Sequence, residues 1–188
     1  MSHTRLAAIV VPIVLALAAF VPSGPAAAAT APHSNLERYV LRLINCTRTG
    51  GWVLKDGTCK DYGSGKHSAY RKPLTLSSSL SNRLSRPYAI RIAAAVYCGH
   101  GLGGRTIVGA FHKAGFHAHH FGENIGCGNW SNPKEDVLQT HLLMQAERGT
   151  GQWHWRHLKD PGYRTIGIGV AVVNGTTRVV EDFYQPGS

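Results

Sequence analysis

Four side chains that can bind a metal or exchange protons form the candidate site of this sequence: His100, Glu123, Glu147 and His154. Glu123 stands between glycines, which let the backbone turn tightly and let other groups approach closely. We expect the segments that carry these four residues to meet and to line one pocket. Two neutral imidazoles and two carboxylates suit a divalent metal, first of all zinc bound by His100 and His154. They equally suit a hydrogen-bonded His–Glu network, or a polar cluster that only stabilises the fold.

Catalysis would need more than these four residues. Hydrolysis requires a metal-activated water, or a nucleophile next to a base. No serine stands in a Gly-x-Ser-x-Gly context, and the cysteines are expected to be used in disulfides. We therefore assign no catalytic residue, and the sequence favours a binding protein over an enzyme.

All four cysteines follow the apolar N-terminal segment. An even number of cysteines in an exported chain argues for two disulfides. Of the possible pairings we favour Cys46–Cys59, which closes a short loop, together with Cys98–Cys127, which ties two segments of the candidate site together. A four-cysteine zinc site is the alternative, although the spacing lacks the close cysteine pairs of such sites.

The N-terminus has the pattern of a signal peptide. Arg5 supplies a positive charge, residues 6–21 are almost entirely apolar, and small residues over 26–31 offer cleavage sites. We expect residues 1–30 to be a signal peptide and residues 31–188 to form one secreted, extracellular domain. The apolar run is shorter than the ~20 residues of a membrane span, so no transmembrane span is expected in the mature chain. An uncleaved N-terminal anchor is the alternative.

The chain is strongly basic. It has 20 Lys and Arg against 10 Asp and Glu, a formal net charge of +10, and only Arg5 among these belongs to the predicted signal peptide. In an exported protein this charge favours anionic partners at the cell envelope, such as anionic lipid, acidic glycan or an anionic envelope polymer. No recognition motif for nucleic acid is present, so no specific nucleic acid is expected. The charge alternatively serves only solubility.

Local patterns predict the elements that position the candidate site. Capping residues, apolar periodicity and turn signals mark their ends. The predicted helices cover 35–49, 77–98, 104–114 and 132–147, and the predicted strands cover 116–121, 163–173 and 176–184. Glu147 falls at a helix C-terminus, where the helix dipole disfavours an acid, which hints at another use for it. Closely spaced histidines in 116–121 add a candidate metal pair, His117 and His119.

Several motifs then follow one another along the chain. They are a Ser-Asn-Leu-Glu-Arg helix start, an Ala-rich helix ending in Cys-Gly-His, Gly-Glu-Asn-Ile, a helix ending in Met-Gln-Ala-Glu, His-Trp-Arg-His, and Ile-Gly-Ile-Gly-Val before a final hairpin. This order resembles the CAP superfamily in its bacterial form, the group of cysteine-rich secretory proteins, antigen 5 and pathogenesis-related proteins with an SCP-like extracellular domain. The resemblance covers nearly all of residues 31–188.

The resemblance implies an α+β fold, an α-β-α sandwich with a small, mainly antiparallel sheet between helical layers. In that family two histidines and two glutamates line a shared cleft, and the matching positions here are His100, Glu123, Glu147 and His154. Many bacterial members have His-Arg-x-Asn where this chain has His-Trp-Arg-His, so His157 is an alternative cleft histidine.

Two functions therefore remain open. The first is a non-enzymatic binding module that engages a lipid, a glycan, an anionic polymer or a protein, with a His/Glu cleft that holds a divalent metal. Family members that bind sterols or fatty acids make a lipid reasonable by analogy alone. The second is a metal-dependent hydrolase of peptide or envelope substrates.

Overall fold

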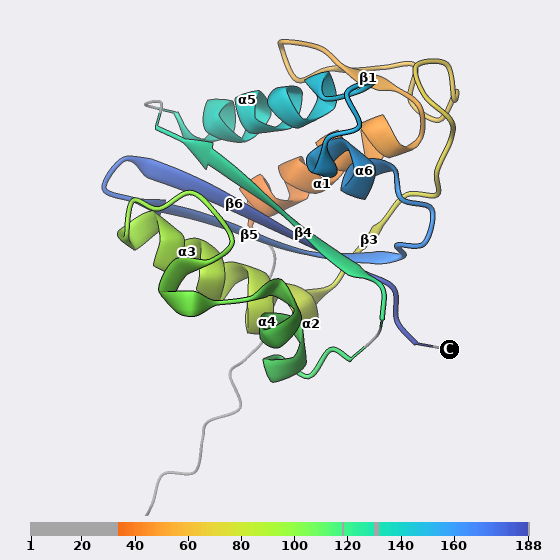
Figure 1. Cartoon of the computed structure of the whole chain (residues 1–188). Coiled ribbons are helices and arrows are strands. Elements are labelled where there is room, and N and C mark those ends of the chain that lie inside the picture. Colours follow the sequence, from red (N-terminus) through yellow and green to blue (C-terminus); the bar gives the residue numbers. More distant parts are fainter. Residues whose placement is uncertain (1–33, 118, 130–131, 188) are drawn as a thin grey trace, which may run out of the picture.

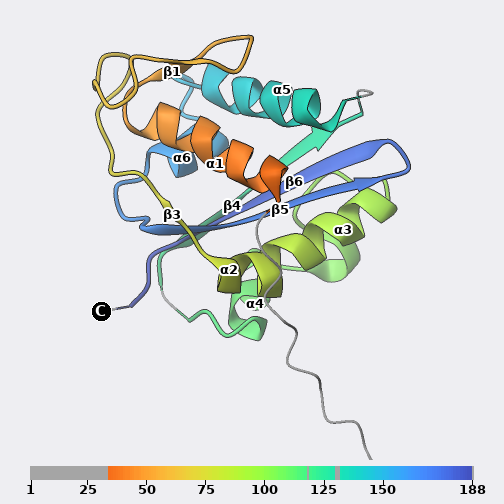
Figure 2. The same cartoon turned by 180° about the vertical axis from the view of Figure 1, so that it is seen from behind.

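The helices and strands form three layers, with a four-stranded sheet between two groups of helices (Figure 1, Figure 2). A computed structural model describes residues 34–117, 119–129 and 132–187. The predicted signal peptide, residues 1–30, lies outside these ranges. The fold is thus an α-β-α sandwich of the α+β class, as the resemblance implied. Within the described ranges no helix is long and apolar enough to cross a membrane.

The helices divide between the two faces of the sheet. One layer holds α1 (Asn35–Arg48), α5 (Pro133–Ala146) and α6 (Trp153–Lys159). The other layer holds α2 (Ser78–Leu80), the π-helix η1 (Ser81–Ser85), α3 (Arg86–Ala94), the 3-10 turn η2 (Leu102–Gly104) and α4 (Ile107–Lys113).

The main sheet has the strand order β3-β5-β6-β4. Its strands are β3 (Thr75–Leu76), β4 (Phe121–Gly128), β5 (Thr165–Val173) and β6 (Thr176–Tyr184). Only β3 pairs in parallel, with β5, and the other pairs are antiparallel. A separate two-stranded sheet joins β1 (Trp52–Val53) to β2 (Cys59–Lys60).

The β5–β6 hairpin confirms the prediction for the C-terminal region. Asn174 and Gly175 connect the strands with φ of 48° and 74°. Two consecutive positive φ values are the geometry of a type I′ turn, which Asn-Gly favours. The hairpin places two acidic residues of β6, Glu181 and Asp182, at the centre of the sheet beside β4.

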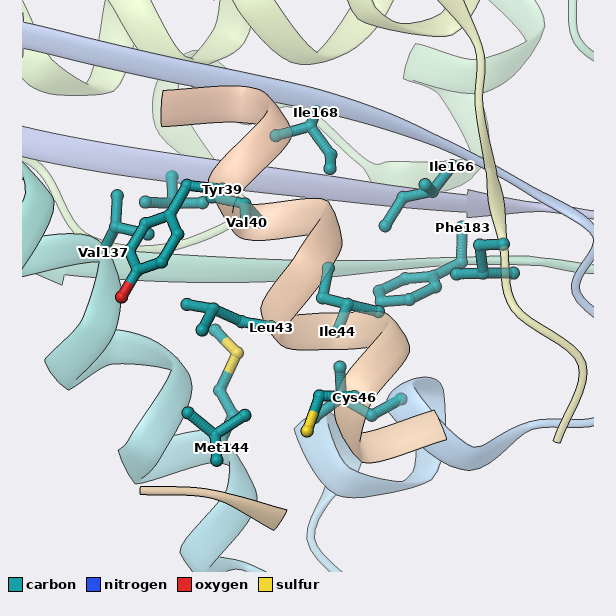
Figure 3. Packing of buried hydrophobic residues seen from close by; sticks show 14 of the residues in the cluster. Tyr39, Val40, Leu43, Ile44, Cys46, Val137, Met144, Ile166, Ile168 and Phe183 are labelled. Atoms are coloured by element: carbon teal, nitrogen blue, oxygen red, sulfur yellow. The ribbon is translucent and has the colours of Figure 1, made fainter. Parts of the chain in front are cut away.

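Helix α1 begins with the predicted capping box. The Ser34 hydroxyl accepts the Glu37 N–H at 3.1 Å, and the Glu37 carboxylate accepts the Ser34 N–H at 2.7 Å. One face of the helix then packs on the sheet and on α5 (Figure 3). The buried side chains of this face are Tyr39, Val40, Leu43 and Ile44. Burial of one such side chain stabilises the fold by about 1.5–3 kcal/mol.

The second predicted helix is divided into α2, η1 and α3. Pro87 lies just after the π-helical turn η1, and both a proline and a π-helical turn disturb the regular α-helical hydrogen bonds. This agrees with the expected kink or abutting helices. The helix ends at Ala94 and not at Cys98, because the chain turns away at Val96, which has a φ of 51°.

The glycine-rich segment around Glu123 is a strand, so its glycines do not form tight turns, whereas the expected close approach of other groups is confirmed. Its glycines are needed for close packing of helices on β4. A Cβ at Gly126 would lie 2.0 Å from Thr140 Cγ2, and a Cβ at Gly128 would lie 2.5 Å from Asp136. Glycine in a strand often marks such a close approach.

The predicted edge strand over 116–121 is wrong. Residues 116, 117, 119 and 120 have no strand structure, and β4 starts only at Phe121. The alternation of Phe and His in this segment reflects aromatic packing: Phe116 lies edge-on to Tyr184, with ring centroids 5.4 Å apart. Tertiary contacts therefore override the local pattern.

Both favoured disulfides are present. Cys46–Cys59 joins α1 to β2, and Cys98–Cys127 joins the end of the α3 region to β4. The described part of the chain has no free cysteine, so the four-cysteine zinc site is excluded. The second disulfide holds the segment before His100 against the strand that carries Glu123.

Candidate functional site

His100 and Glu123 form the first of two His–Glu pairs. His100 Nδ1 lies 2.7 Å from Glu123 Oε1. The Tyr88 hydroxyl on α3 donates to the carbonyl of Gly99 at 2.8 Å, which fixes the backbone next to His100. The Glu123 side chain is fully buried, whereas 43% of the His100 side chain is exposed. The carboxylate therefore orients the imidazole while its other edge faces solvent.

Arg105 is the main partner of Glu123, and sequence reasoning missed it. Its Nη1 donates to Glu123 Oε1 at 2.9 Å, and its Nη2 donates to Oε2. The guanidinium also lies over the Tyr88 ring, 3.8 Å from the centroid. Burial alone would raise the pKa of Glu123, but hydrogen bonds from His100 and Arg105 outweigh it and hold that pKa below its usual range. The Glu123 carboxylate is thus held in one position, and its ionised form is favoured.

A second buried carboxyl stands beside this pair. Asp182 faces Glu123 across the β4–β6 ladder and accepts a 2.7 Å hydrogen bond from the Ser85 hydroxyl. Burial, followed by the negative charge of Glu123, raises the pKa of Asp182 well above its usual range. Two adjacent buried carboxyls do not both ionise readily, so the pair favours the proton on Asp182 and the charge on Glu123.

Glu147 and His154 form the second pair. Glu147 is the C-cap of α5, and its Oε1 lies 2.6 Å from His154 Nδ1 on α6. Its Oε2 accepts the Trp155 N–H at 3.2 Å. The unusual place of Glu147 at a helix C-terminus is therefore explained, since the carboxylate satisfies an N–H in the first turn of α6. Both side chains are partly exposed, 22% for Glu147 and 35% for His154.

Asn124 and His157 connect this second pair to the sheet. His157 Nδ1 donates to Asn124 Oδ1 at 2.8 Å, and Asn124 Nδ2 donates to the His154 carbonyl at 3.4 Å and to Glu181 Oε2 at 3.2 Å. Burial, and then the charge of His154, lowers the pKa of His157 to about 4. Burial raises the pKa of Glu181 to about 7.

The four predicted residues thus form two separate pairs. Glu123 and Asn124 are neighbours on β4, so their side chains point to opposite faces of the sheet. His157 lies within electrostatic reach of both pairs, because the charges of His154, His100 and Glu123 all act on its pKa. The structure gives no direct hydrogen bond between the pairs among the residues it describes.

Each pair leaves one imidazole nitrogen that could act as a metal ligand. In each pair Nδ1 is committed to a carboxylate, which leaves Nε2 as the free ligand atom, and this is the usual orientation of metal-binding histidines. Across the described residues, however, no group of three or more His, Cys, Asp or Glu is placed to hold a metal. Any ion here would take two protein ligands at most from the described set, with water completing its shell.

Comparison with known proteins identifies the fold. No family model and no curated protein matches the sequence. An extracellular protein containing an SCP domain from Bacillus anthracis str. Ames aligns with a TM-score of 0.53 and 12% identity, over 82% of this chain and 45% of its own. The structure of NaASP2 with Zn2+ aligns with a TM-score of 0.52 and 15% identity, over 82% of each chain. This chain therefore shares the fold of these proteins, and it spans less than half the length of the SCP-domain protein from Bacillus.

Proposed function

We propose that this protein is a secreted, non-enzymatic binding module of the CAP type that acts at the cell envelope or outside the cell. Residues 1–30 are its signal peptide and residues 31–188 its single domain. Two disulfides support an oxidising compartment, and one structural neighbour is described as extracellular. The net charge of +10 supports an anionic partner, such as lipid, glycan or envelope polymer, with a protein partner as the alternative.

The observation that carries this proposal is the use of both carboxylates as supports for histidines. Glu123 is bound by His100 and Arg105, and Glu147 by His154 and a backbone N–H. Both carboxylates are therefore already engaged by groups of the protein itself. This arrangement favours ligand or metal binding over hydrolysis, although a metal-dependent hydrolase remains the alternative to be tested.

We further propose that His100 and His154 bind a divalent metal, with zinc first, through their Nε2 atoms. The side chains are partly exposed, so an ion can reach them. The zinc-bound structure of NaASP2 supports testing this metal first. A bound ion would supply positive charge and open coordination positions for an anionic ligand.

Calorimetric zinc titration of the oxidised protein tests this site. We expect one site that loses at least tenfold in affinity in His100→Ala and in His154→Ala. The control is His117→Ala/His119→Ala, which removes two exposed histidines of the 116–121 segment and should leave the site unchanged. If zinc affinity falls in His117→Ala/His119→Ala but is unchanged in His100→Ala and His154→Ala, then His100 and His154 do not bind the metal.

Screening peptide and envelope substrates decides between the two functions. Stoichiometric capture of a ligand without turnover is expected for a binding module. Turnover that disappears on chelation and in Glu123→Ala would instead establish the hydrolase. Because Glu123 is buried, folding of that variant has to be checked first by circular dichroism.

A further inference from the structure

A groove of about 580 Å³ lies between α3 and α4 and has a strongly cationic lining. Both helices lie on the face of the sheet that is opposite α1 and α5 (Figure 1). Arg83, Arg91, Arg105 and Lys113 all line the groove, and no acidic residue does so within the described chain. Such a concentration of positive charge on one surface attracts anions.

Three of these cations are available to a ligand. Arg105 is committed to Glu123, whereas Arg83, Arg91 and Lys113 form no salt bridge with any described residue. All three are exposed. Their charges are therefore not neutralised by the protein itself.

The available cations stand at both ends of the groove. Arg91 reaches the η2 end, where its Nη2 approaches the Leu102 carbonyl at 3.5 Å. Arg83 reaches the other end, beyond Lys113, where it lies over the Phe116 ring at 5.2 Å. Eight residues of helix separate Arg83 from Arg91, which corresponds to about 12 Å along the axis. A single small anion cannot span this distance.

Apart from Arg105, whose charge is paired with Glu123, the lining between the two ends is uncharged. Leu84, Tyr88, Leu102 and Ala114 contribute to it, and Gly109 leaves room because it has no side chain. A Cβ at Gly104 would have no heavy atom within 4 Å, so the η2 side is also unobstructed. This shape admits an extended chain that lies along the groove.

We propose that the α3–α4 groove binds a linear phosphate-bearing polyanion that is long enough to place phosphates at both ends of the groove. The inference rests on the proposed binding function and supplies its ligand class. The site is distinct from the His/Glu cleft, because none of His100, Glu123, Glu147 and His154 lines the groove. Arg105 forms the wall between the two. Membrane insertion is less favoured, since Trp52, Trp153 and Trp155 all lie outside the groove lining.

Titration with inorganic polyphosphate, pyrophosphate and orthophosphate tests the proposal. The oxidised protein is used with chelator present, so that metal binding at the cleft does not contribute. We expect polyphosphate to bind at least tenfold more tightly than orthophosphate, because only the chain reaches both ends. Arg91→Gln/Lys113→Gln, which removes one cation from each end, should lower polyphosphate affinity at least tenfold. It should also reduce the slope of log K against log salt by about one for each cation removed.

The matched control is Lys55→Gln/Lys60→Gln, which removes two exposed cations from the β1–β2 region. Its polyphosphate affinity should differ from that of the unmodified protein by less than about twofold, once the smaller net charge is taken into account. If both double variants lose the same polyphosphate affinity, the groove is not the binding site, and the protein binds polyanions only through its overall positive charge. Binding to vesicles of anionic phospholipid without polyphosphate binding would overturn the ligand class. The zinc titration does not depend on the groove, so the two proposals fail separately.

Discussion

The two His–Glu pairs have the same chemistry and opposite surroundings. Glu123 is fully buried and bound by Arg105, and beside it lies Asp182, whose pKa is raised by burial and by the charge of Glu123. Glu147 is partly exposed at the end of a helix, and its carboxylate is shared between His154 and a backbone N–H. The first carboxylate therefore belongs to the interior of the sandwich and the second to its surface, while both histidines are partly exposed.

Two pairs of the same residue types therefore have different roles, because their surroundings differ. A buried carboxylate with an arginine is held in one state and position. A surface pair is screened by water and contributes little to folding. We infer that the first pair positions His100 rigidly, whereas the second leaves His154 able to adjust to a ligand.

The largest effect is expected from removal of Arg105. Arg105→Met keeps apolar contact with Tyr88 but leaves the Glu123 carboxylate buried without its main partner. We expect a loss of about 3–5 kcal/mol in the free energy of unfolding. Urea denaturation at neutral pH measures it.

Two variants control this experiment. Arg156→Ala, an exposed arginine of α6, should cost less than about 1 kcal/mol. Arg105→Met/Glu123→Gln should recover much of the loss, because no charge remains buried. If Arg105→Met is as stable as the unmodified protein, the two pairs do not differ as described.

The next effect concerns pH and Glu181, which lies behind the second pair. Burial raises the pKa of Glu181 from 4.5 to about 7. Between these values the unfolded chain releases a proton that the folded protein keeps, so this group lowers stability as pH rises. Glu181→Gln should therefore become more stable relative to the unmodified protein by on the order of 3 kcal/mol between pH 4.5 and pH 7.

The difference between the two stability curves is the quantity to measure. His141 and His157, whose pKa values are lowered by burial to about 3 and about 4, give the opposite trend, since they favour the folded state as pH rises. Their contribution cancels in the difference. Parallel curves over this pH range would show that Glu181 titrates as an ordinary surface acid.

The sequence predicted those features that local signals determine. The capping box of α1, the Asn-Gly turn and both disulfides are found as expected, because each depends on neighbouring residues or on a few possible pairings. The three layers followed from the resemblance and are present. Both His–Glu contacts join predicted site residues.

The environment of each pair was not predicted, for a physical reason. Asp182 and Glu181 reach the site through the register of β6 against β4, which no local pattern specifies. Arg105 precedes α4 without any motif around it. The glycines of β4 were expected to allow turns or close approach, and only the folded structure shows that they are needed for the close packing of helices. Burial and counter-charge are tertiary properties, so roles that depend on them become visible only in the folded structure.

The smallest effect on folding, and the sharpest test of the comparison, is expected from Glu147→Gln. Glutamine retains an acceptor for His154 Nδ1 but removes the charge, and the site is partly exposed, so the free energy of unfolding should change by less than about 1 kcal/mol. Zinc affinity should nevertheless fall about 10–100-fold, because the carboxylate raises the basicity of the imidazole that binds the ion. Glu135→Gln, on the same helix, should change neither quantity.

If Glu147→Gln destabilises the protein as strongly as Arg105→Met, the second pair is as structural as the first. If it leaves zinc binding intact while His154→Ala abolishes it, Glu147 only fills space beside the ligand, and the adjustable site reduces to the histidine alone.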